Sequence, residues 1–209
     1  YDGLTRDVDY TQWVAWYQKW FQRSEVPVNI VLDLACGTGT LTCLLAQAGY
    51  SMIGTDLSIE MLSEAQEKTF DLDCEPPVFL HQSMDKLDLF GTIDACVSSL
   101  DSLNYVTRPA AVRRTFKRVH DALKPGGLFL FDVKTPLALE GADGQVYLDE
   151  NDELYCVWRG EYHPKRRICG YGIDLFALQE DGSWLRGGEY HEEYAYTMDE
   201  LAQWLAEVG

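Results

Sequence analysis

The residue pattern with the clearest chemical meaning is a glycine-containing turn followed, about 20 residues later, by a carboxylate. The turn is VLDLACGTGT at 31–40, and the carboxylate is Asp56 in GTDLS at 54–58. Gly37 and Gly39 would let the backbone approach a ligand closely, and the first amides of the following helix would point into the same place. An acid at that distance can bind both hydroxyls of a ribose. The pattern therefore predicts a site for a nucleoside.

The details of the turn disfavour a dinucleotide. The fingerprint G-x-G-x-x-G would require a third glycine where this chain has Thr42. Asp33, just before the turn, would repel a diphosphate, but it suits a ligand that carries an ammonium and a sulfonium. S-adenosylmethionine (SAM) carries both groups. The residues therefore favour SAM, and a NAD-dependent dehydrogenase is a remote alternative.

Alternating strands and helices would position this turn. Helical spacing of aromatic residues predicts a helix at 10–23, with Asp9 or Thr11 as its cap. Apolar strands are predicted at 28–35, 51–56, 77–82, 92–100 and 126–133, and helices between them at 41–49, 58–69 and 108–123. Short links between such segments predict an α/β fold with a Rossmann-like, doubly wound, mostly parallel sheet.

The pattern changes beyond Pro136. Three segments rich in Tyr, Trp, Val and Ile are separated by the turn sequences HPK and EDGS, and they predict antiparallel strands at 153–162, 166–179 and 183–196. Thr197 and Glu200 form a capping box before a last helix. We therefore expect a Rossmann-like domain at 1–135 and 197–209 and an antiparallel β insertion at 136–196. The insertion would be a substrate lid or a contact in a homodimer.

Composition limits the possible partners. The formal net charge of -17 disfavours nucleic acid as a partner, because such binding depends on Lys and Arg neutralising phosphates. We interpret the basic residues within 113–118 as a solvated face of a helix. Six cysteines without metal-ligand spacing predict reduced thiols and no metal site. Without a long apolar run or a signal peptide, we expect a cytoplasmic protein with no membrane partner.

Taken together, the motifs resemble those of class I SAM-dependent methyltransferases, specifically the small bacterial type 11, type 12 or YqeM-like proteins. The landmarks, in order, are YDGLTRDVDYTQWV, LDLACGTG, GTDLSIEML, SSLDSLNYV and LKPGGLFLFDV. The resemblance covers nearly the whole chain. It implies SAM as the cofactor and methyl transfer as the activity.

The resemblance also implies residue roles in binding SAM. Asp33 would orient the turn and the methionine end, while Gly37 and Gly39 would line the methionine and the ribose. Asp56 would bind the ribose hydroxyls. The full expected set is Tyr10, Asp33, Ala35, Cys36, Gly37, Gly39, Asp56, Leu57, Met61, Ser83, Met84, Asp85 and Leu100.

Several of these roles have alternatives. Met61 would flank the adenine together with Leu57, but its helical spacing also suits the core. Ser83 stands where the family often has Asp, so adenine contact falls to Ser83, Met84 or Asp85, and Asp85 equally suits a solvated turn. Tyr1 or Tyr10 would cover the cofactor, or pack in an N-terminal helix.

Methyl transfer from a sulfonium requires alignment of the reacting atoms rather than a catalytic triad. A base is needed only if the acceptor is protonated, and the candidates are Asp101, His163 and His191, of which Asp101 and His191 are retained. We interpret His163, in the HPK turn, as an exposed histidine with a structural role. Glu192 and Glu193 would attract a cationic amine acceptor or form a solvated strand edge.

The expected function is methyl transfer to a nitrogen or oxygen atom of a small-molecule acceptor. The alternatives are an RNA or protein methyltransferase and a non-catalytic SAM-binding module. The family fold usually adds two strands after the last helix, so we expect a C-terminal strand pair outside this sequence.

Overall fold

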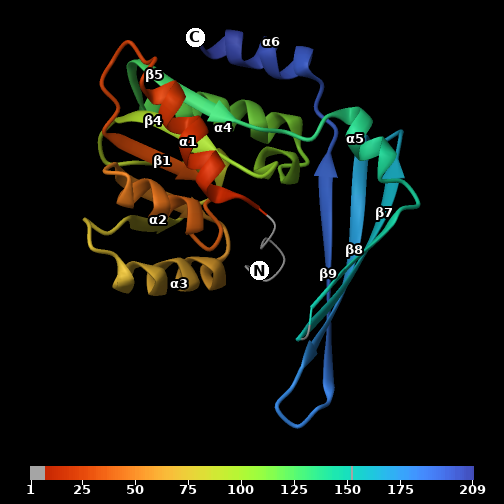
Figure 1. The fold of residues 1–209 in the computed structure, drawn as a ribbon. Coiled ribbons are helices and arrows are strands. Elements are labelled where there is room, and N and C mark those ends of the chain that lie inside the picture. The colour runs from red at the N-terminus through yellow and green to blue at the C-terminus, as the bar shows by residue number, and fades with distance from the viewer. Residues whose placement is uncertain (1–7, 152) are drawn as a thin grey trace. The chain divides into compact units, whose positions relative to one another are not determined.

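The computed structural model describes residues 8–151 and 153–209, which form two compact units (Figure 1). The first unit holds the described residues up to Leu103, together with Pro109–Asp132 and Trp204–Gly209. The second unit holds Asn104–Arg108 and Val133–Gln203. The glycine turn and Asp56 therefore lie in the first unit, and the aromatic strand segments lie in the second.

Within the described residues, the first unit contains a five-stranded parallel sheet with the order β3-β2-β1-β4-β5. The strands are β1 (Ile30–Leu34), β2 (Ser51–Asp56), β3 (Val78–His81), β4 (Ile93–Ser98) and β5 (Leu123–Phe131). The chain runs outward from β1 to β3 and then returns to add β4 on the other side of β1. The order therefore reverses between β1 and β4, where open α/β sheets bind their ligands. The predicted Rossmann-like sheet is confirmed.

The helices begin where the sequence supplies a cap. The Asp9 carboxylate accepts the Gln12 N–H at 3.1 Å and starts α1, and the Ser58 hydroxyl accepts the Met61 N–H at 3.1 Å and starts α3. The main helices of the parallel-sheet region are α1 (Tyr10–Phe21), α2 (Thr40–Gln47), α3 (Ile59–Lys68) and α4 (Pro109–Ala122). Short 3₁₀ turns follow at Thr69–Asp71, Met84–Lys86 and Ser102–Tyr105.

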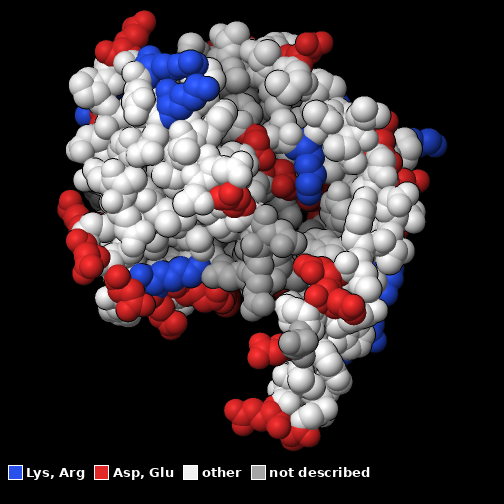
Figure 2. All heavy atoms as spheres, in the orientation of Figure 1, with Lys and Arg blue, Asp and Glu red and all other residues white. Residues whose placement is uncertain are grey.

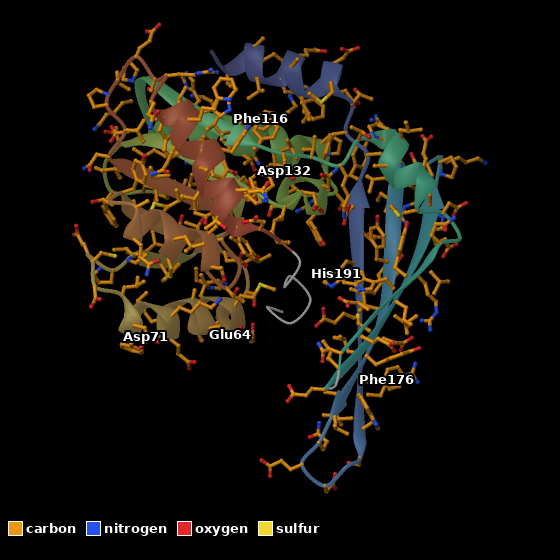
Figure 3. All side chains as sticks on the ribbon, viewed as in Figure 1. Glu64, Asp71, Phe116, Asp132, Phe176 and His191 are labelled. Atoms are coloured by element: carbon orange, nitrogen blue, oxygen red, sulfur yellow. The ribbon has the colours of Figure 1, made fainter. Side chains whose placement is uncertain are left out.

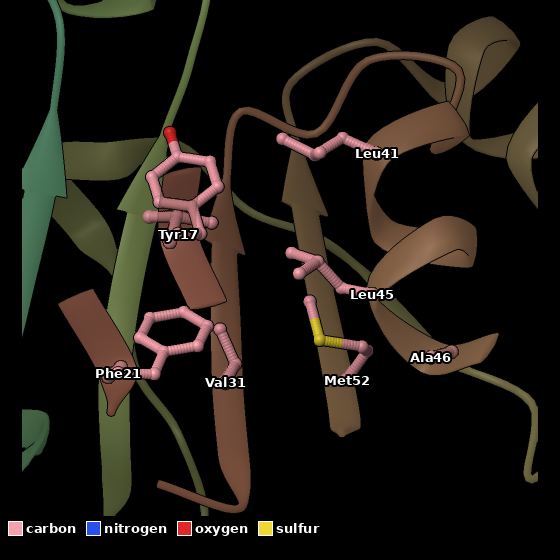
Figure 4. Packing of buried hydrophobic residues seen from close by; sticks show 9 residues of the cluster. Tyr17, Phe21, Val31, Leu41, Leu45, Ala46 and Met52 are labelled. Carbon is pink, nitrogen blue, oxygen red and sulfur yellow. The ribbon is translucent and has the colours of Figure 1, made fainter. Parts of the chain in front are cut away.

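The core of the first unit lies on both faces of the parallel sheet. On one face, Tyr17 and Phe21 of α1 and Leu45 of α2 pack against Val31 and Met52 (Figure 4). On the other face, a second buried cluster brings a residue of α4 onto the sheet; its members are Leu32, Leu34, Leu87, Ile93, Cys96 and Val119. Successive residues of β1 thus point into opposite clusters. Burial on both faces explains why the strands read as continuous apolar runs.

The second unit contains, in the part of the chain that the structure describes, a four-stranded antiparallel sheet with the order β6-β7-β8-β9. The strands are β6 (Val146–Glu150), β7 (Leu154–His163), β8 (Ile168–Leu178) and β9 (Trp184–Tyr194). A short helix, α5 (Pro136–Gly141), packs Leu139 against Cys169 and Tyr171 of β8.

The prediction of three antiparallel strands was incomplete, because β6 and α5 were missed. Every side chain of β6 is exposed, so the segment has no buried face to produce an alternating pattern. Backbone pairing with β7, from Val146 opposite Arg159 to Glu150 opposite Tyr155, holds it instead. His163 is the last residue of β7 rather than part of the turn.

The predicted capping box is confirmed. The Thr197 N–H donates to Glu200 at 2.9 Å, and the Glu200 N–H donates to the Thr197 hydroxyl at 3.2 Å, so α6 begins at Met198 and continues to Val208. All six cysteines fall within the described residues and are free thiols. In the described part of the chain, the helices are too short or too polar to cross a bilayer.

Asp94 anchors the amino end of the parallel sheet. Its carboxylate accepts the N–H groups of Asn29 at 2.9 Å and Ile30 at 2.8 Å, and it pairs with the Lys124 ammonium at 2.6 Å. Burial acts to raise the pKa of this carboxyl, but the two N–H groups and the ammonium outweigh burial and lower it. The folded state therefore favours the charged form of Asp94.

We expect Asp94→Asn to lower the free energy of unfolding at pH 7 by about 1–3 kcal/mol, because charge-assisted hydrogen bonds are lost. A lowered pKa gives stability that is present above the unfolded value of about 4 and disappears as the pH falls through the folded value. Urea unfolding should thus show a smaller difference near about pH 3 than at pH 7. The exposed Asp71→Asn variant is the control, and equal differences at both pH values would contradict the prediction.

Candidate functional site

The turn after β1 is shaped by backbone conformations that ordinary residues avoid. Ala35, Gly37 and Gly39 have φ angles of 62°, 55° and 70°. A Cβ at Gly39 would lie 2.7 Å from the Cβ of Ala65 and 3.0 Å from the ring of Phe79, so only glycine fits there. Gly37 is different, since among the described residues a Cβ there would meet only the Met61 sulfur, at 3.8 Å. The backbone at Gly37 is therefore open to a ligand.

Asp56 joins the glycine turn to the end of β2. Its Oδ2 accepts the Gly37 N–H and its Oδ1 accepts the Ser58 N–H, both at 2.9 Å. The Cys36 N–H donates to the Thr55 carbonyl at 2.9 Å, which ties the same two segments together again. Each carboxylate oxygen of Asp56 retains a lone pair. The carboxylate is thus oriented by the backbone and can accept two further hydrogen bonds.

Asp33 lies beneath the turn with only 2% of its surface exposed. Its Oδ2 accepts the Thr42 hydroxyl at 2.6 Å. Thr42 occupies the position where a dinucleotide fold would have its third glycine, and its hydroxyl is the partner of the buried acid. Burial, with a contribution from the negative charge of Asp56, raises the pKa of Asp33 to about 7.

The residues expected to contact an adenine differ in how exposed they are and in what they pack against. The Leu57 side chain is 70% exposed, beside the end of β2, and Met61 lies next to Gly37. Met84 packs against the buried cluster beneath α4. Their adenine contacts stay predictions.

Asp85 has a partner of its own. It pairs with Arg114 of α4 at 2.7 Å and accepts the Ser83 hydroxyl at 3.0 Å. The hydrogen bond from Arg114 lowers the pKa of Asp85 despite partial burial. The carboxylate is therefore held by α4, and an adenine role for Ser83 or Asp85 stays a prediction.

The end of β4 is strained. Leu100 and Asp101 have φ angles of 56° and 52°, and left-handed non-glycine residues persist only where their surroundings hold them. The Asp101 N–H donates to Asp132 Oδ2 at 2.9 Å. Next to them, Ser99 Oγ and Tyr17 Oη lie 2.7 Å apart in a buried hydrogen bond. The left-handed conformation of these residues thus directs the Asp101 N–H toward Asp132, the residue that follows β5.

Asp132 was not among the predicted site residues (Figure 3). It directly follows β5, its N–H donates to the Ser98 carbonyl at 3.4 Å, and its Oδ1 is buried without a hydrogen-bond partner among the described residues. Burial raises the pKa of this carboxyl, and the charge of Asp101 adds to the effect. Asp56 ends β2 and Asp132 directly follows β5, so an acid at the end of an apolar strand is a sequence signal that the two residues share.

Tyr10 is the first residue of α1 and packs against the core cluster that contains Tyr17. Tyr1 lies outside the described residues. The covering role expected for either tyrosine stays a prediction.

The two candidate bases lie in different compact units, Asp101 in the first and His191 in the second. His191 Nε2 is 2.9 Å from Glu189 Oε2, and its ring packs edge-on against Tyr105 with the centroids 5.8 Å apart. His163 Nε2 lies 3.9 Å from Glu161. The base roles of Asp101 and His191 stay predictions.

The second unit holds a pocket of about 370 Å³ lined mainly by small and aromatic side chains: Lys134, Ala138, Ala142, Tyr147, Trp158 and Tyr171. Its ammonium, Lys134, pairs with buried Glu193 at 2.9 Å, and Glu192 pairs with Arg166 at 3.2 Å. Both acids therefore have cationic partners within the same unit. A lid or dimer role for the unit stays a prediction.

The charge on the surface is mostly negative. Acidic side chains are spread over the face shown in Figure 2, while Lys and Arg gather in a few separate places. Three basic residues of α4 are paired with acids, Arg113 with Glu207, Arg114 with Asp85 and Lys117 with Asp121. Across residues 8–151 and 153–209, His, Cys, Asp and Glu form no group of three that could hold a metal ion.

We expect Asp33→Asn to stabilise the protein increasingly as the pH rises from about 4 to about 8. A carboxyl whose folded pKa is raised stabilises the fold when protonated and costs free energy as the pH rises from the unfolded value to the folded one. Asparagine keeps an acceptor for Thr42 and carries no charge to bury. Urea unfolding of both proteins across this range measures the difference, and a difference that does not change with pH would show that Asp33 is charged throughout.

Comparison with known proteins connects this geometry to a family. A family described as "Methyltransferase domain" matches residues 31–127. "Putative methyltransferase YqeM" of Bacillus subtilis is 33% identical over 211 residues, which cover all of this chain and 83% of that protein. "Putative methyltransferase GWCH70_2453" of Geobacillus sp. (strain WCH70) is 31% identical and is covered to 85% of its length.

Solved structures of methyltransferases show the same fold. A SAM-dependent methyltransferase from Clostridium acetobutylicum aligns with a TM-score of 0.89 at 29% identity, covering 98% of this chain and 82% of that one. The SAM-bound amino pentose methyltransferase CalS10 from Micromonospora echinaspora shares the fold, with a TM-score of 0.81 at 20% identity and coverage of 98% and 84%. The glycine turn and the parallel sheet are therefore those of an enzyme that uses SAM, and the chain belongs to the YqeM-like SAM-dependent methyltransferases.

Proposed function

We propose that this methyltransferase acts on a nitrogen or oxygen atom of a small organic acceptor. The observation that carries the proposal is the gathering of acids at the carboxyl edge of the parallel sheet, where Asp33, Asp56, Asp101 and Asp132 lie at or within three residues of the ends of four strands. On a chain of net charge -17, such an edge repels polyanions. RNA binding would instead need a surface of Lys and Arg.

The same edge fits SAM. Asp56 would accept hydrogen bonds from the ribose hydroxyls with the lone pairs that its backbone contacts leave available. The open backbone at Gly37 would allow the close approach of the cofactor, and Asp33 would act through the shape of the turn by holding Thr42. When bound, SAM supplies a methyl group on a positively charged sulfur. The contribution of the protein is then to align the acceptor with that group.

We expect Asp56→Ala to weaken the binding of SAM and of its product S-adenosylhomocysteine (SAH) by at least about tenfold. A charge-assisted hydrogen bond to the ligand contributes about 1.5–3 kcal/mol, and the variant also releases the Gly37 N–H. Isothermal titration calorimetry with SAH measures the loss. Asp71→Ala changes an exposed acid outside the turn and serves as the matched control. Unchanged affinity in Asp56→Ala would remove Asp56 from the site.

The class of acceptor is tested by SAH release from SAM with three sets of probes: small amines and alcohols, transfer RNA, and unmodified protein from a cell extract. We expect turnover with members of the first set, because the acidic edge repels polyanions and alignment of a small acceptor suffices. Coupled detection of SAH measures the rates. Turnover confined to RNA or protein would contradict the proposal.

A further inference from the structure

We propose that Asp132 binds the methyl acceptor, and that the acceptor is an amine whose ammonium proton passes to the Asp132 carboxylate. The inference rests on the proposed function and deepens it. It assigns a catalytic residue and a substrate class to the carboxyl edge of the sheet.

The two oxygens of the Asp132 carboxylate have different surroundings. Oδ2 accepts the Asp101 N–H at 2.9 Å, whereas Oδ1 is buried and has no hydrogen-bond partner among the described residues. Buried carboxylate oxygens in folded proteins normally have donors, and one without a donor calls for an explanation. A ligand with N–H groups would supply the missing donor.

The backbone next to Asp132 is distorted where it holds this side chain. Leu100 and Asp101 are consecutive left-handed residues, and the N–H they present is bound to Asp132. Such strain is costly and is found at functional sites more often than elsewhere. The strained backbone therefore fixes Oδ2 of Asp132, and this also sets the orientation of Oδ1.

The position of Asp132 in the sheet suits a residue that contacts the acceptor. The residues proposed for the nucleoside follow β1 and β2, and the order of strands reverses between β1 and β4. Asp132 follows β5, on the opposite side of that reversal. A crevice at such a reversal takes a ligand across both sides. Asp132 thus lies on the half of the carboxyl edge that is left for the acceptor, while the nucleoside uses the other half.

The acids around Asp132 favour a cationic acceptor. Asp101 and Asp132 are joined directly, and Asp33 and Asp132 both act electrostatically on Tyr17, so three acids share this part of the edge. Their field attracts a cation and opposes an anionic acceptor such as a carboxylate or phosphate. Burial and the neighbouring Asp101 raise the pKa of Asp132, which makes its carboxylate a better proton acceptor. An amine, cationic in water, matches both properties.

Methyl transfer to the amine begins with the loss of a proton from the ammonium. The ammonium gives one proton to Asp132 Oδ1, which leaves a neutral amine with a lone pair and a neutral carboxylic acid. As the nitrogen–carbon bond forms, the methyl–sulfur bond breaks and its electron pair stays on sulfur as a thioether. The product carries the positive charge on nitrogen, and Asp132 returns its proton to water.

The test compares wild type with Asp132→Asn on a panel of primary and secondary amines, each matched with the alcohol of the same carbon skeleton. SAH release measures kcat/KM, and calorimetry measures the affinity for SAH. We expect wild type to prefer amines, and Asp132→Asn to lose about 100-fold in kcat/KM on amines. SAH affinity should stay within about twofold of wild type, which also shows that the variant is folded. Asp71→Asn is the matched exposed control.

Three results would overturn the inference. These are turnover confined to the alcohols, full activity of Asp132→Asn on amines, and a loss of SAH affinity parallel to the loss of rate, which would make Asp132 a cofactor ligand. Failure of the proposed function is distinguishable from these outcomes. In that case wild type binds SAH but releases none from SAM with any amine or alcohol.

Discussion

The hydrogen bond from the Gly37 N–H to the Asp56 carboxylate is the contact on which the geometry of the carboxyl edge depends. It joins a turn of unusual backbone conformation to the end of the neighbouring strand. Because the same carboxylate also accepts the Ser58 N–H, the start of α3 is tied to the turn as well. Two strands and a helix are thereby aligned by one acid, which still has lone pairs for a ligand.

The parallel sheet brings the acids of this edge together. Parallel strands end at one edge, so acids that follow β2 and β5 reach the same side of the sheet although 76 positions separate Asp56 from Asp132 (132 minus 56). Apolar clusters on both faces hold the strands in register beneath them. Buried acids at the edge are destabilising on their own. The raised pKa values of Asp33 and Asp132 reflect the destabilisation that burial of their charge would cause, and the packing of the sheet offsets it.

Strongly patterned elements were predictable from sequence. The apolar run of β1, the helical aromatic spacing of α1 and the capping box at Thr197 each depend on local chemistry. Strand β6 was not predictable, because its exposed side chains carry no pattern and its pairing with β7 is made by backbone groups that every residue has. The same limit applies to Asp85, whose partner Arg114 lies 29 positions away.

The sequence alone determined that this chain has a glycine turn, an acid at the distance suited to a ribose, and the strand and helix alternation of a SAM-dependent enzyme. These features are local, since they follow from residue types at fixed spacing. The tertiary structure decided that Thr42 binds Asp33 and that one oxygen of Asp132 has no described partner. Such pairings depend on which strand ends meet, and the order of strands is set by packing across the whole sheet rather than by neighbours in the chain.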